Sequence, residues 1–189
     1  MNARRDAQRG FTLIELMVTA ALLAVLSTLA IPALLTFKRN ADLTSVVNSM
    51  VGALNAARAE AMKRNLSAMI VPVANDWANG WNVFIDLNRD GLYTANTDLL
   101  VMNQVALPTY INFVGNGALA DPIDKYIMYD GSGFPKSRTA GFTPNATIEI
   151  KRTDAAMDFS QYRRIMIALA GRVSVCTPKT ALDPACPPP

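Results

Sequence analysis

The segment RGFTLIELM, residues 9–17, places a short basic leader directly before a long apolar run that contains one carboxylate. From Phe11 to Phe37 the run has no Lys, Arg or Asp, and as a helix it would be roughly 40 Å long. It can therefore cross a hydrocarbon core, which is about 30 Å thick. Glu15 is the unusual member, because an ionisable group inside such a run costs on the order of 2.5–3.5 kcal/mol and indicates a function.

The spacing leaves two interpretations of Glu15 open. In the first, the carboxylate lies in the interfacial zone of the membrane and needs no partner. In the second, the chain is cut between Gly10 and Phe11, and the new α-amino group of this chain or of a neighbour supplies a cation at the depth of Glu15. No side chain in the run can supply that cation.

The residues from Gly10 to Met17 resemble the processing site of class III signal sequences, which type IV pilins and type II secretion pseudopilins carry. The shared features are a basic leader ending in glycine, an aromatic residue, a glutamate four residues later, and an apolar helix with a proline, here Pro32. The resemblance implies that prepilin peptidase cleaves between Gly10 and Phe11 and that Phe11 is N-methylated. It also implies that Glu15 meets the Phe11 amine of an adjacent subunit during filament assembly, and that the helix melts locally near Pro32 in the filament.

The composition suits one anchor helix and one small domain, with 189 residues, 51% of them hydrophobic, and a net charge of +3. The leader, residues 1–10, holds three arginines against one aspartate, so its removal leaves the rest of the chain at +1. We therefore interpret the basicity as a targeting signal on the cytoplasmic side. The chain has no histidine, which excludes a histidine-based triad or dyad, and it carries no nucleophile motif or phosphate loop. We expect a structural subunit without a cofactor, and no enzyme.

Beyond Phe37, apolar residues continue at helical spacing, which predicts one helix from about Phe11 to Asn65. Residues 11–37 would form its transmembrane or filament-core half, and residues 38–66 an amphipathic half that a soluble layer must cover. Pro32 removes one backbone hydrogen bond and is expected to kink or loosen the helix. The amphipathic stripe consists of Leu43, Val46, Val47, Met50, Leu54, Ala57 and Ala61.

In residues 67–189 the period changes to two, which predicts a mostly antiparallel sheet with the amphipathic half of the helix on one face, an α+β fold. Strands are expected at 68–73, 81–86, 99–105, 110–114, 126–129, 147–151, 164–169 and 173–176. The segments 80–90, 126–134, 146–151 and 163–176 resemble the GspH/FimT family of H-type minor pseudopilins and FimT and FimU minor pilins. This resemblance implies a type IV pilin-like fold.

The segment DLNRDG begins like a calcium loop, because the oxygens of Asp86, Asn88 and Asp90 can converge on one hard cation. The closing ligand is missing, since Thr97 is at the twelfth position and Asp98 comes one place late. The flanks are also predicted strands, where an EF-hand has helices. We therefore favour a hairpin turn over a calcium site.

The two cysteines, Cys176 and Cys186, lie near the C-terminus on either side of a proline-containing segment. In a periplasmic domain they are expected to form a disulfide, and closing so short a loop would contribute about 3 kcal/mol. Metal binding is not expected here, because two thiols without histidine are too few soft ligands.

The C-terminal third is locally basic, with Arg163, Arg164, Arg172 and Lys179 as candidate phosphate contacts. Some FimT proteins bind DNA in natural transformation through a Gly-Arg-x-Arg motif, and the corresponding stretch here is GRVS, residues 171–174, which lacks the second arginine. DNA binding is therefore an alternative that we rank below a structural role.

Together these features predict a minor pilin or pseudopilin that takes part in filament assembly or initiation. It would be held in the bacterial inner membrane by a single pass, with a periplasmic domain, and would then enter a type IV pilus or type II secretion pseudopilus. Its expected partners are prepilin peptidase and other minor and major pilins. The rival classes are a DNA-capture module and a plain membrane-anchored periplasmic binding domain.

Overall fold

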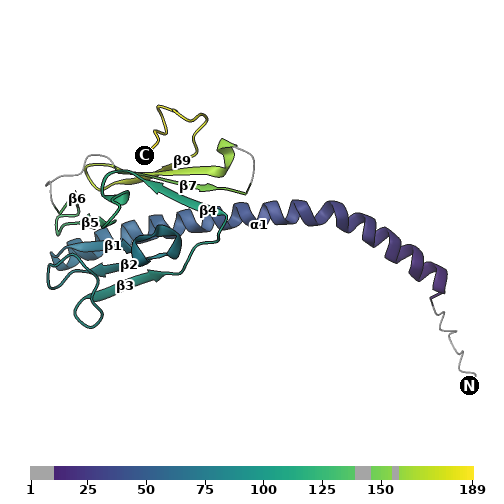
Figure 1. Ribbon diagram of the computed structural model, residues 1–189, viewed down its shortest axis with the longest axis horizontal. Helices are drawn as coiled ribbons and strands as arrows, with labels where there is room; N and C mark the ends of the chain where they lie inside the picture. Colours follow the sequence, from purple (N-terminus) through teal and green to yellow (C-terminus); the bar gives the residue numbers. More distant parts are fainter. Residues whose placement is uncertain (1–10, 139–145, 155–157) are drawn as a thin grey trace, which may run out of the picture. The chain divides into compact units, whose positions relative to one another are not determined.

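The structure, a computed structural model, describes residues 11–138, 146–154 and 158–189. The chain divides into two compact units, Met1–Asn40 and Ala41–Pro189. One long helix, α1 (Leu13–Arg64), contributes its first part to the first unit and its second part to the second (Figure 1). The prediction of one helix is thus confirmed to within two residues at either end.

In the first unit, the described chain is the beginning of α1. For the membrane-span test, α1 is taken as two parts that meet at a bend, Leu13–Thr28 and Ala30–Arg64. Within the described residues, no single helix has both the length and the hydropathy of a membrane span, but these two parts pass that test together, by length and composition.

In the second unit, α1 buries one face in a core. All seven residues of the predicted stripe are buried, with exposed fractions from 0% at Met50 to 6% at Val46, and Ala53 is buried beside them. The spacing of apolar side chains at mostly three or four residues, which is typical of one helix face, therefore identified the buried face correctly. The final turn carries Lys63 and Arg64, cations that suit the negative end of the helix dipole.

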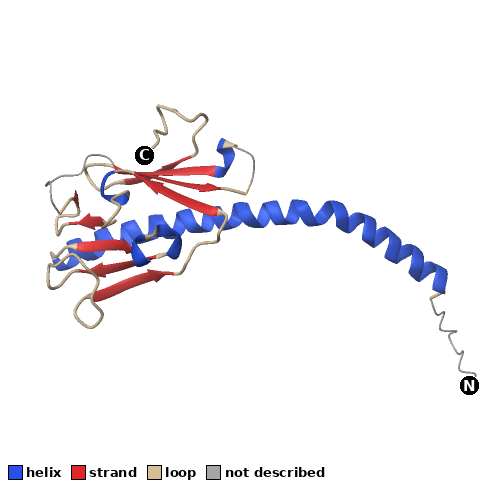
Figure 2. Ribbon diagram, in the orientation of Figure 1, coloured by secondary structure: helices blue, strands red, loops and turns tan. Residues whose placement is uncertain are grey.

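The described strands form two sheets in which every pairing is antiparallel (Figure 2). The first sheet has the order β3 (Leu99–Gln104), β2 (Trp81–Ile85), β1 (Ala68–Pro72), β5 (Ile127–Tyr129) and β6 (Pro135–Lys136). The second has the order β4 (Ile111–Gly115), β7 (Ala146–Arg152), β8 (Tyr162–Ile167) and β9 (Val173–Cys176). Among the described residues, four short 3₁₀ helices lie in the connections between strands, at Val73–Asn75, Trp77–Asn79, Gly117–Leu119 and Phe159–Gln161.

The two sheets share one core with the second part of α1. Ile70 and Val83 of the first sheet and Ile148 and Ile165 of the second belong to the same buried cluster as Met50 of the helix. The expectation of one sheet on one face of the helix was therefore incomplete. Periodicity locates strands, but it does not say how distant strands divide between sheets.

The eight predicted strands are all present, and their ends agree to within two residues. The largest shift is at β8, which begins at Tyr162 where residue 164 was expected. The strand β6 was missed because two residues, one of them Pro135, are too short to display a period.

The turn between β8 and β9 is fixed onto α1 by Arg58, whose guanidinium donates to the carbonyls of Ala170 (2.8 Å) and Gly171 (3.2 Å). Gly171 has a φ of +74°, and a Cβ at this position would lie 2.4 Å from the carbonyl oxygen of Gly133 and 3.0 Å from Arg58 Nε. A glycine is therefore required here both by the backbone conformation and by the close approach of the Gly133 carbonyl.

We expect Gly52→Ala to raise the free energy of unfolding by about 0.5–1 kcal/mol, because glycine weakens a helix interior relative to alanine. Gly52 lies on the exposed face of α1, and an added Cβ would meet nothing within 4 Å. Urea unfolding of the full chain in detergent, followed by tryptophan fluorescence, measures the change. Gly171→Ala is the matched control and should destabilise; a loss of stability in Gly52→Ala would contradict the prediction.

Candidate functional site

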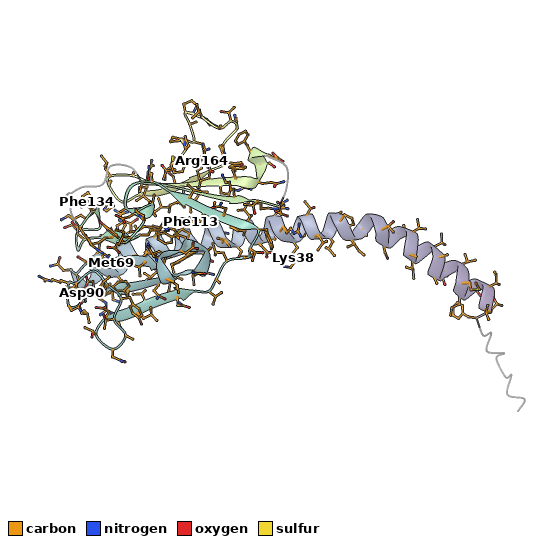
Figure 3. The ribbon with its side chains drawn as sticks, in the orientation of Figure 1. Lys38, Met69, Asp90, Phe113, Phe134 and Arg164 are labelled. Carbon is orange, nitrogen blue, oxygen red and sulfur yellow. A yellow bond between two sulfur atoms is a disulfide. The ribbon has the colours of Figure 1, made fainter. Side chains whose placement is uncertain are left out.

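The first unit carries its large apolar side chains on the surface. Every such side chain described from Phe11 to Phe37 is between 47% and 85% exposed (Figure 3). Contiguous apolar surface of this extent marks an interaction with a membrane or with other protein chains. The described part of the first unit contains no second element that could cover it.

The hydroxyl groups of this part of α1 are satisfied within the helix itself. Thr19 donates to the carbonyl of Leu16 at 2.9 Å, and Thr28 donates to the carbonyl of Val25 at 2.7 Å. Ser27 and Thr36 make equivalent bonds one turn back, to Leu23 (2.7 Å) and Pro32 (3.1 Å). A helix whose polar side chains bond to its own backbone presents an outer surface suited to lipid or to other helices.

The helix begins immediately after Thr12, whose Oγ1 accepts a hydrogen bond from the Glu15 N–H at 3.3 Å. Thr12 thus caps the helix, a role that the sequence analysis missed although the Thr-x-x-Glu spacing of a capping box was present. The Glu15 side chain is exposed, and it makes no ion pair within the described part of the chain. Phe11 is 85% exposed, and Gly10 lies outside the described residues.

Pro32 lies inside α1, which continues as a helix on both sides of it. The bent pair of helix parts has its break between Thr28 and Ala30, within one turn of this proline. Pro32 has no N–H to donate to the Thr28 carbonyl, so the backbone ladder is weakened at the place where the sequence predicted it. Its role in a filament stays a prediction.

The candidate calcium residues lie in the connection from β2 to β3. Asp86 is buried, whereas Asn88 and Asp90 are exposed. The Asp90 N–H donates to Asn88 Oδ1 at 3.2 Å, and the Leu92 N–H donates to Asp90 Oδ1 at 2.7 Å. These are the side-chain-to-backbone bonds by which Asn and Asp stabilise turns, as the hairpin interpretation expected.

The C-terminal segment, residues 177–189, is fixed to the second sheet by a disulfide between Cys176 and Cys186, as predicted. Arg164 of β8 reinforces this attachment, since its Nη1 donates to the carbonyl of Cys186 at 2.6 Å and its Nη2 to that of Ala181 at 3.1 Å. Its Nε donates to Oε2 of Glu149 on β7 at 2.8 Å. Arg164 therefore joins the sheet and the C-terminal segment through one buried guanidinium.

This burial corrects one of the predicted phosphate contacts. Arg164 is 2% exposed and its guanidinium is enclosed by Glu149 and main-chain carbonyls, so it does not lie on a surface that DNA could reach. Arg163 is half-buried and donates to the carbonyls of Ser160 and Tyr162. Arg172 and Lys179 are exposed, as expected. The sequence could not show which arginines pair with Glu149, because the partner is on another strand.

The C-terminal segment also contains a carboxyl group with a shifted pKa. The main-chain N–H groups of Lys179 and Ala185 donate to Asp183 and hold the pKa of its carboxyl below the usual value. A lowered pKa in the folded state means that the ionised carboxyl stabilises the segment at neutral pH. This contribution is lost as the pH falls through the folded-state pKa.

The fold and the exposed apolar surface of the first part of α1 together define a pilin-like protein. Residues 46–171 match the family described as Type II transport protein GspH, and residues 5–31 match the Prokaryotic N-terminal methylation motif. The chain therefore belongs to the GspH family and is a minor pilin or pseudopilin.

Two curated relatives are similar to this chain over short stretches. The chain is 50% identical over 46 residues to Prepilin peptidase-dependent protein D of Escherichia coli (strain K12), which is 24% of this chain and 32% of that protein. It is 44% identical over 48 residues to Type II secretion system core protein G of Klebsiella michiganensis, which is 25% of this chain and 34% of that protein. The matches thus span about a third of the length of these relatives.

Solved structures share the fold over most of the chain. The type IV minor pilin FimU of Pseudomonas aeruginosa (strain PAO1) superposes with a TM-score of 0.56 at 16% identity, covering 77% of this chain and 99% of that one. The minor pseudopilin EpsH from the Type 2 Secretion System of Vibrio cholerae superposes with a TM-score of 0.50 at 12% identity, covering 74% and 99%. At these identities the likeness establishes the fold.

We expect Arg164→Met to lower the free energy of unfolding by about 3–5 kcal/mol, because it leaves the buried Glu149 carboxylate without its main partner. Arg172→Met is the matched control on an exposed arginine and should change stability by less than about 0.5 kcal/mol. Urea unfolding of the full chain under oxidising conditions measures both. Equal, small effects of the two substitutions would contradict the structural role of Arg164.

Proposed function

We propose that this chain is a minor structural subunit of a type IV pilus or a type II secretion pseudopilus and enters the filament through α1. The observation that carries the proposal is the exposed apolar surface of the first unit, which stands in contrast to the complete core of the second unit. The apolar surface of the first unit must therefore be covered by something other than water. Lipid covers it before assembly, and the helices of other subunits cover it after assembly.

Before assembly, the chain is held in the bacterial inner membrane by residues 11–37, with the second unit in the periplasm. The arginine-rich leader supports this orientation, because positive residues are retained on the cytoplasmic side. The disulfide between Cys176 and Cys186 supports an oxidising compartment for the second unit.

Maturation consists of cleavage between Gly10 and Phe11 by prepilin peptidase, followed by N-methylation of Phe11. The match of residues 5–31 to the N-terminal methylation motif supports this step. The local similarity to a protein named for its dependence on prepilin peptidase supports it as well. Cleavage creates an α-amino group four residues before Glu15, where the uncleaved chain has a main-chain amide.

Glu15 then guides assembly by pairing with the Phe11 amine of an adjacent subunit. Its carboxylate is exposed and makes no ion pair in the described part of the chain, so it is available to a neighbour. In surroundings of low dielectric an ion pair is worth more than in water, and it relieves the cost of an isolated charge. The apolar surface supplies most of the attraction, and the pair fixes the register. Other minor and major pilins are the partners.

Cleavage separates this proposal from a plain membrane-anchored binding domain. We expect Gly10→Val to block maturation, because the peptidase needs a residue without bulk beside the scissile bond. Mass spectrometry of the membrane fraction should find the uncleaved chain in Gly10→Val. Gly52→Val, a control far from the cleavage site, should still yield a chain that begins at methylated Phe11. A mature methylated chain from Gly10→Val would contradict the processing site.

We expect Glu15→Ala to leave cleavage and membrane insertion intact but to lower the amount of subunit in filaments severalfold. The substitution makes the helix cheaper to keep in lipid and removes the attraction to the neighbour's amine, so both effects favour the unassembled chain. Glu15→Gln should behave similarly if the charge matters.

The measurement is the ratio of the subunit in sheared filaments to the subunit in the membrane pool. Glu60→Ala is the matched control, because Glu60 is the other glutamate of α1 and pairs with Lys63 and Arg64 in the second unit. Wild-type incorporation of Glu15→Ala would show that this carboxylate does not direct assembly.

A further inference from the structure

The second unit has two chemically different ends along the strand direction of the first sheet. The register of β1 with β5 places Ala68 opposite Tyr129 and Ile70 opposite Ile127. The end of α1 and the turn after Tyr129 therefore lie beyond one end of these strands (Figure 1). The segments after Pro72 and before Ile127 lie beyond the other end.

At the end where α1 stops, three apolar side chains from three elements are exposed. Met62 of α1 is 52% exposed, Phe134 of the β5–β6 turn 46%, and Leu169 of the β8–β9 turn 44%. A Cβ on Gly133 would lie 2.6 Å from Met62 Sδ, and a Cβ on Gly171 would lie 2.4 Å from the Gly133 carbonyl oxygen. The three elements are therefore in contact, and their exposed side chains form one apolar surface.

Polar contacts hold this apolar surface in place. Through its Oδ1, Asp130 accepts the N–H groups of Ser132 (2.9 Å) and Phe134 (3.0 Å). Its Oδ2 pairs with Lys136 at 2.9 Å. Arg58 holds the β8–β9 turn through its two bonds to main-chain carbonyls. A surface that is already ordered loses little conformational entropy when a partner covers it, so binding is favoured.

The charge on the segments that form this surface is positive. Residues 58–64, 130–136 and 168–172 contain five cations and two carboxylates, a net charge of +3. The cations are Arg58, Lys63, Arg64, Lys136 and Arg172, and the carboxylates are Glu60 and Asp130. We call these three segments the basic end.

The opposite end of the strands also exposes apolar side chains. Ile123 is 86% exposed, Val105 is 70% exposed and Val73 is 37% exposed. Val73 follows β1, Val105 follows β3 and Ile123 precedes β5, so the three residues lie beyond the same ends of these strands.

The turn that carries Ile123 is fixed by its own polar contacts. Oδ1 of Asp121 accepts the N–H groups of Ile123 (2.8 Å) and Asp124 (3.0 Å). These bonds hold the pKa of the Asp121 carboxyl below its usual value, so this group is charged at neutral pH. The side chain of Asn75 accepts the Lys125 N–H at 2.8 Å, which ties the turn to the segment after β1.

The charge at this opposite end is negative. Residues 73–80, 105–109 and 120–126 contain three carboxylates and one cation, a net charge of −2. These charged residues are Asp76, Asp121, Asp124 and Lys125. Arg138, which lies outside these segments, pairs with Asp124 and reduces the excess, but it leaves the end negative. We call these three segments the acidic end.

We propose that the basic end of one copy of this chain binds the acidic end of a second copy, head to tail. The two ends are complementary because both expose apolar side chains and their charges are opposite, whereas two like ends would repel each other. A contact between two different surfaces can repeat without closing, as the contacts within helical filaments do. The inference rests on the proposed function, because it adds a contact between second units to the contacts that α1 makes.

The test is disulfide crosslinking between single-cysteine variants of the full chain in detergent micelles. Both native cysteines are joined in one disulfide, so an introduced cysteine is the free thiol of its chain. Ser132→Cys at the basic end and Ala120→Cys at the acidic end replace exposed residues and keep the apolar side chains. One variant carries a C-terminal affinity tag, so that mixed and like dimers differ in size.

We expect the mixture of Ser132→Cys and Ala120→Cys to give several times more mixed dimer than a control mixture. The control pairs Ser132→Cys with Leu182→Cys, because Leu182 is 80% exposed but lies in the C-terminal segment, outside both ends. It measures collisions between chains that share a micelle. Each variant oxidised alone should give little like dimer.

Charge reversal assigns the crosslink to the two ends. Arg172→Glu in the Ser132→Cys chain should lower the yield of mixed dimer severalfold, because it places a carboxylate opposite the acidic end. Asp76→Lys in the Ala120→Cys chain should then restore the yield. Asp90→Lys is the matched control, since Asp90 is an exposed aspartate outside both ends, and it should restore nothing.

Two results would overturn the proposal. One is a yield of mixed dimer no higher than that of the Leu182→Cys control. The other is a yield that does not respond to Arg172→Glu, or that Asp76→Lys and Asp90→Lys restore equally. Neither result bears on filament entry through the first unit, so failure of this proposal and failure of the proposed function are distinguishable.

Discussion

The apolar surface of the first part of α1 is the constraint on which the account depends, because this surface has to be covered and the described part of its own unit does not cover it. Each large apolar side chain contributes roughly 1.5–3 kcal/mol when it is buried. Burial of the apolar side chains from Phe11 to Phe37 therefore contributes more free energy than any single polar interaction of the helix. The second part of α1 thus contributes to the core of a folded domain, whereas the first part presents a surface for association.

The described part of the second unit has a core of its own, and two of its arginines, the half-buried Arg58 and the buried Arg164, hold segments of that unit together. Arg58 fixes the β8–β9 turn to the helix, and Arg164 fixes the C-terminal segment to the second sheet. Both arginines use main-chain carbonyls as acceptors, so they join segments that are far apart in sequence. The disulfide between Cys176 and Cys186 strengthens the same C-terminal attachment. Local basicity in this region thus reflects packing as much as surface charge.

The sequence predicted the helix, its buried stripe and the eight longer strands, because each of these depends on a local period or on turn residues. It did not predict the division into two sheets or the role of Arg164, because both depend on contacts between distant strands. The cap at Thr12 could have been recognised from its spacing to Glu15. The burial of Asp86 could not be recognised from the sequence, since burial of a loop aspartate depends on the surrounding tertiary structure.

Site-specific photo-crosslinking from the helix surface tests most directly whether other subunits cover the first unit. A photoreactive residue at Leu26, which is 62% exposed, would be compared with one at Leu182, which is 80% exposed in the C-terminal segment. In cells that assemble filaments, the account predicts crosslinks from position 26 to the N-terminal helices of other pilins, identified by mass spectrometry, and none of these from position 182. Recovery of position 26 without crosslinks to any pilin, in filaments that contain the chain, would contradict it.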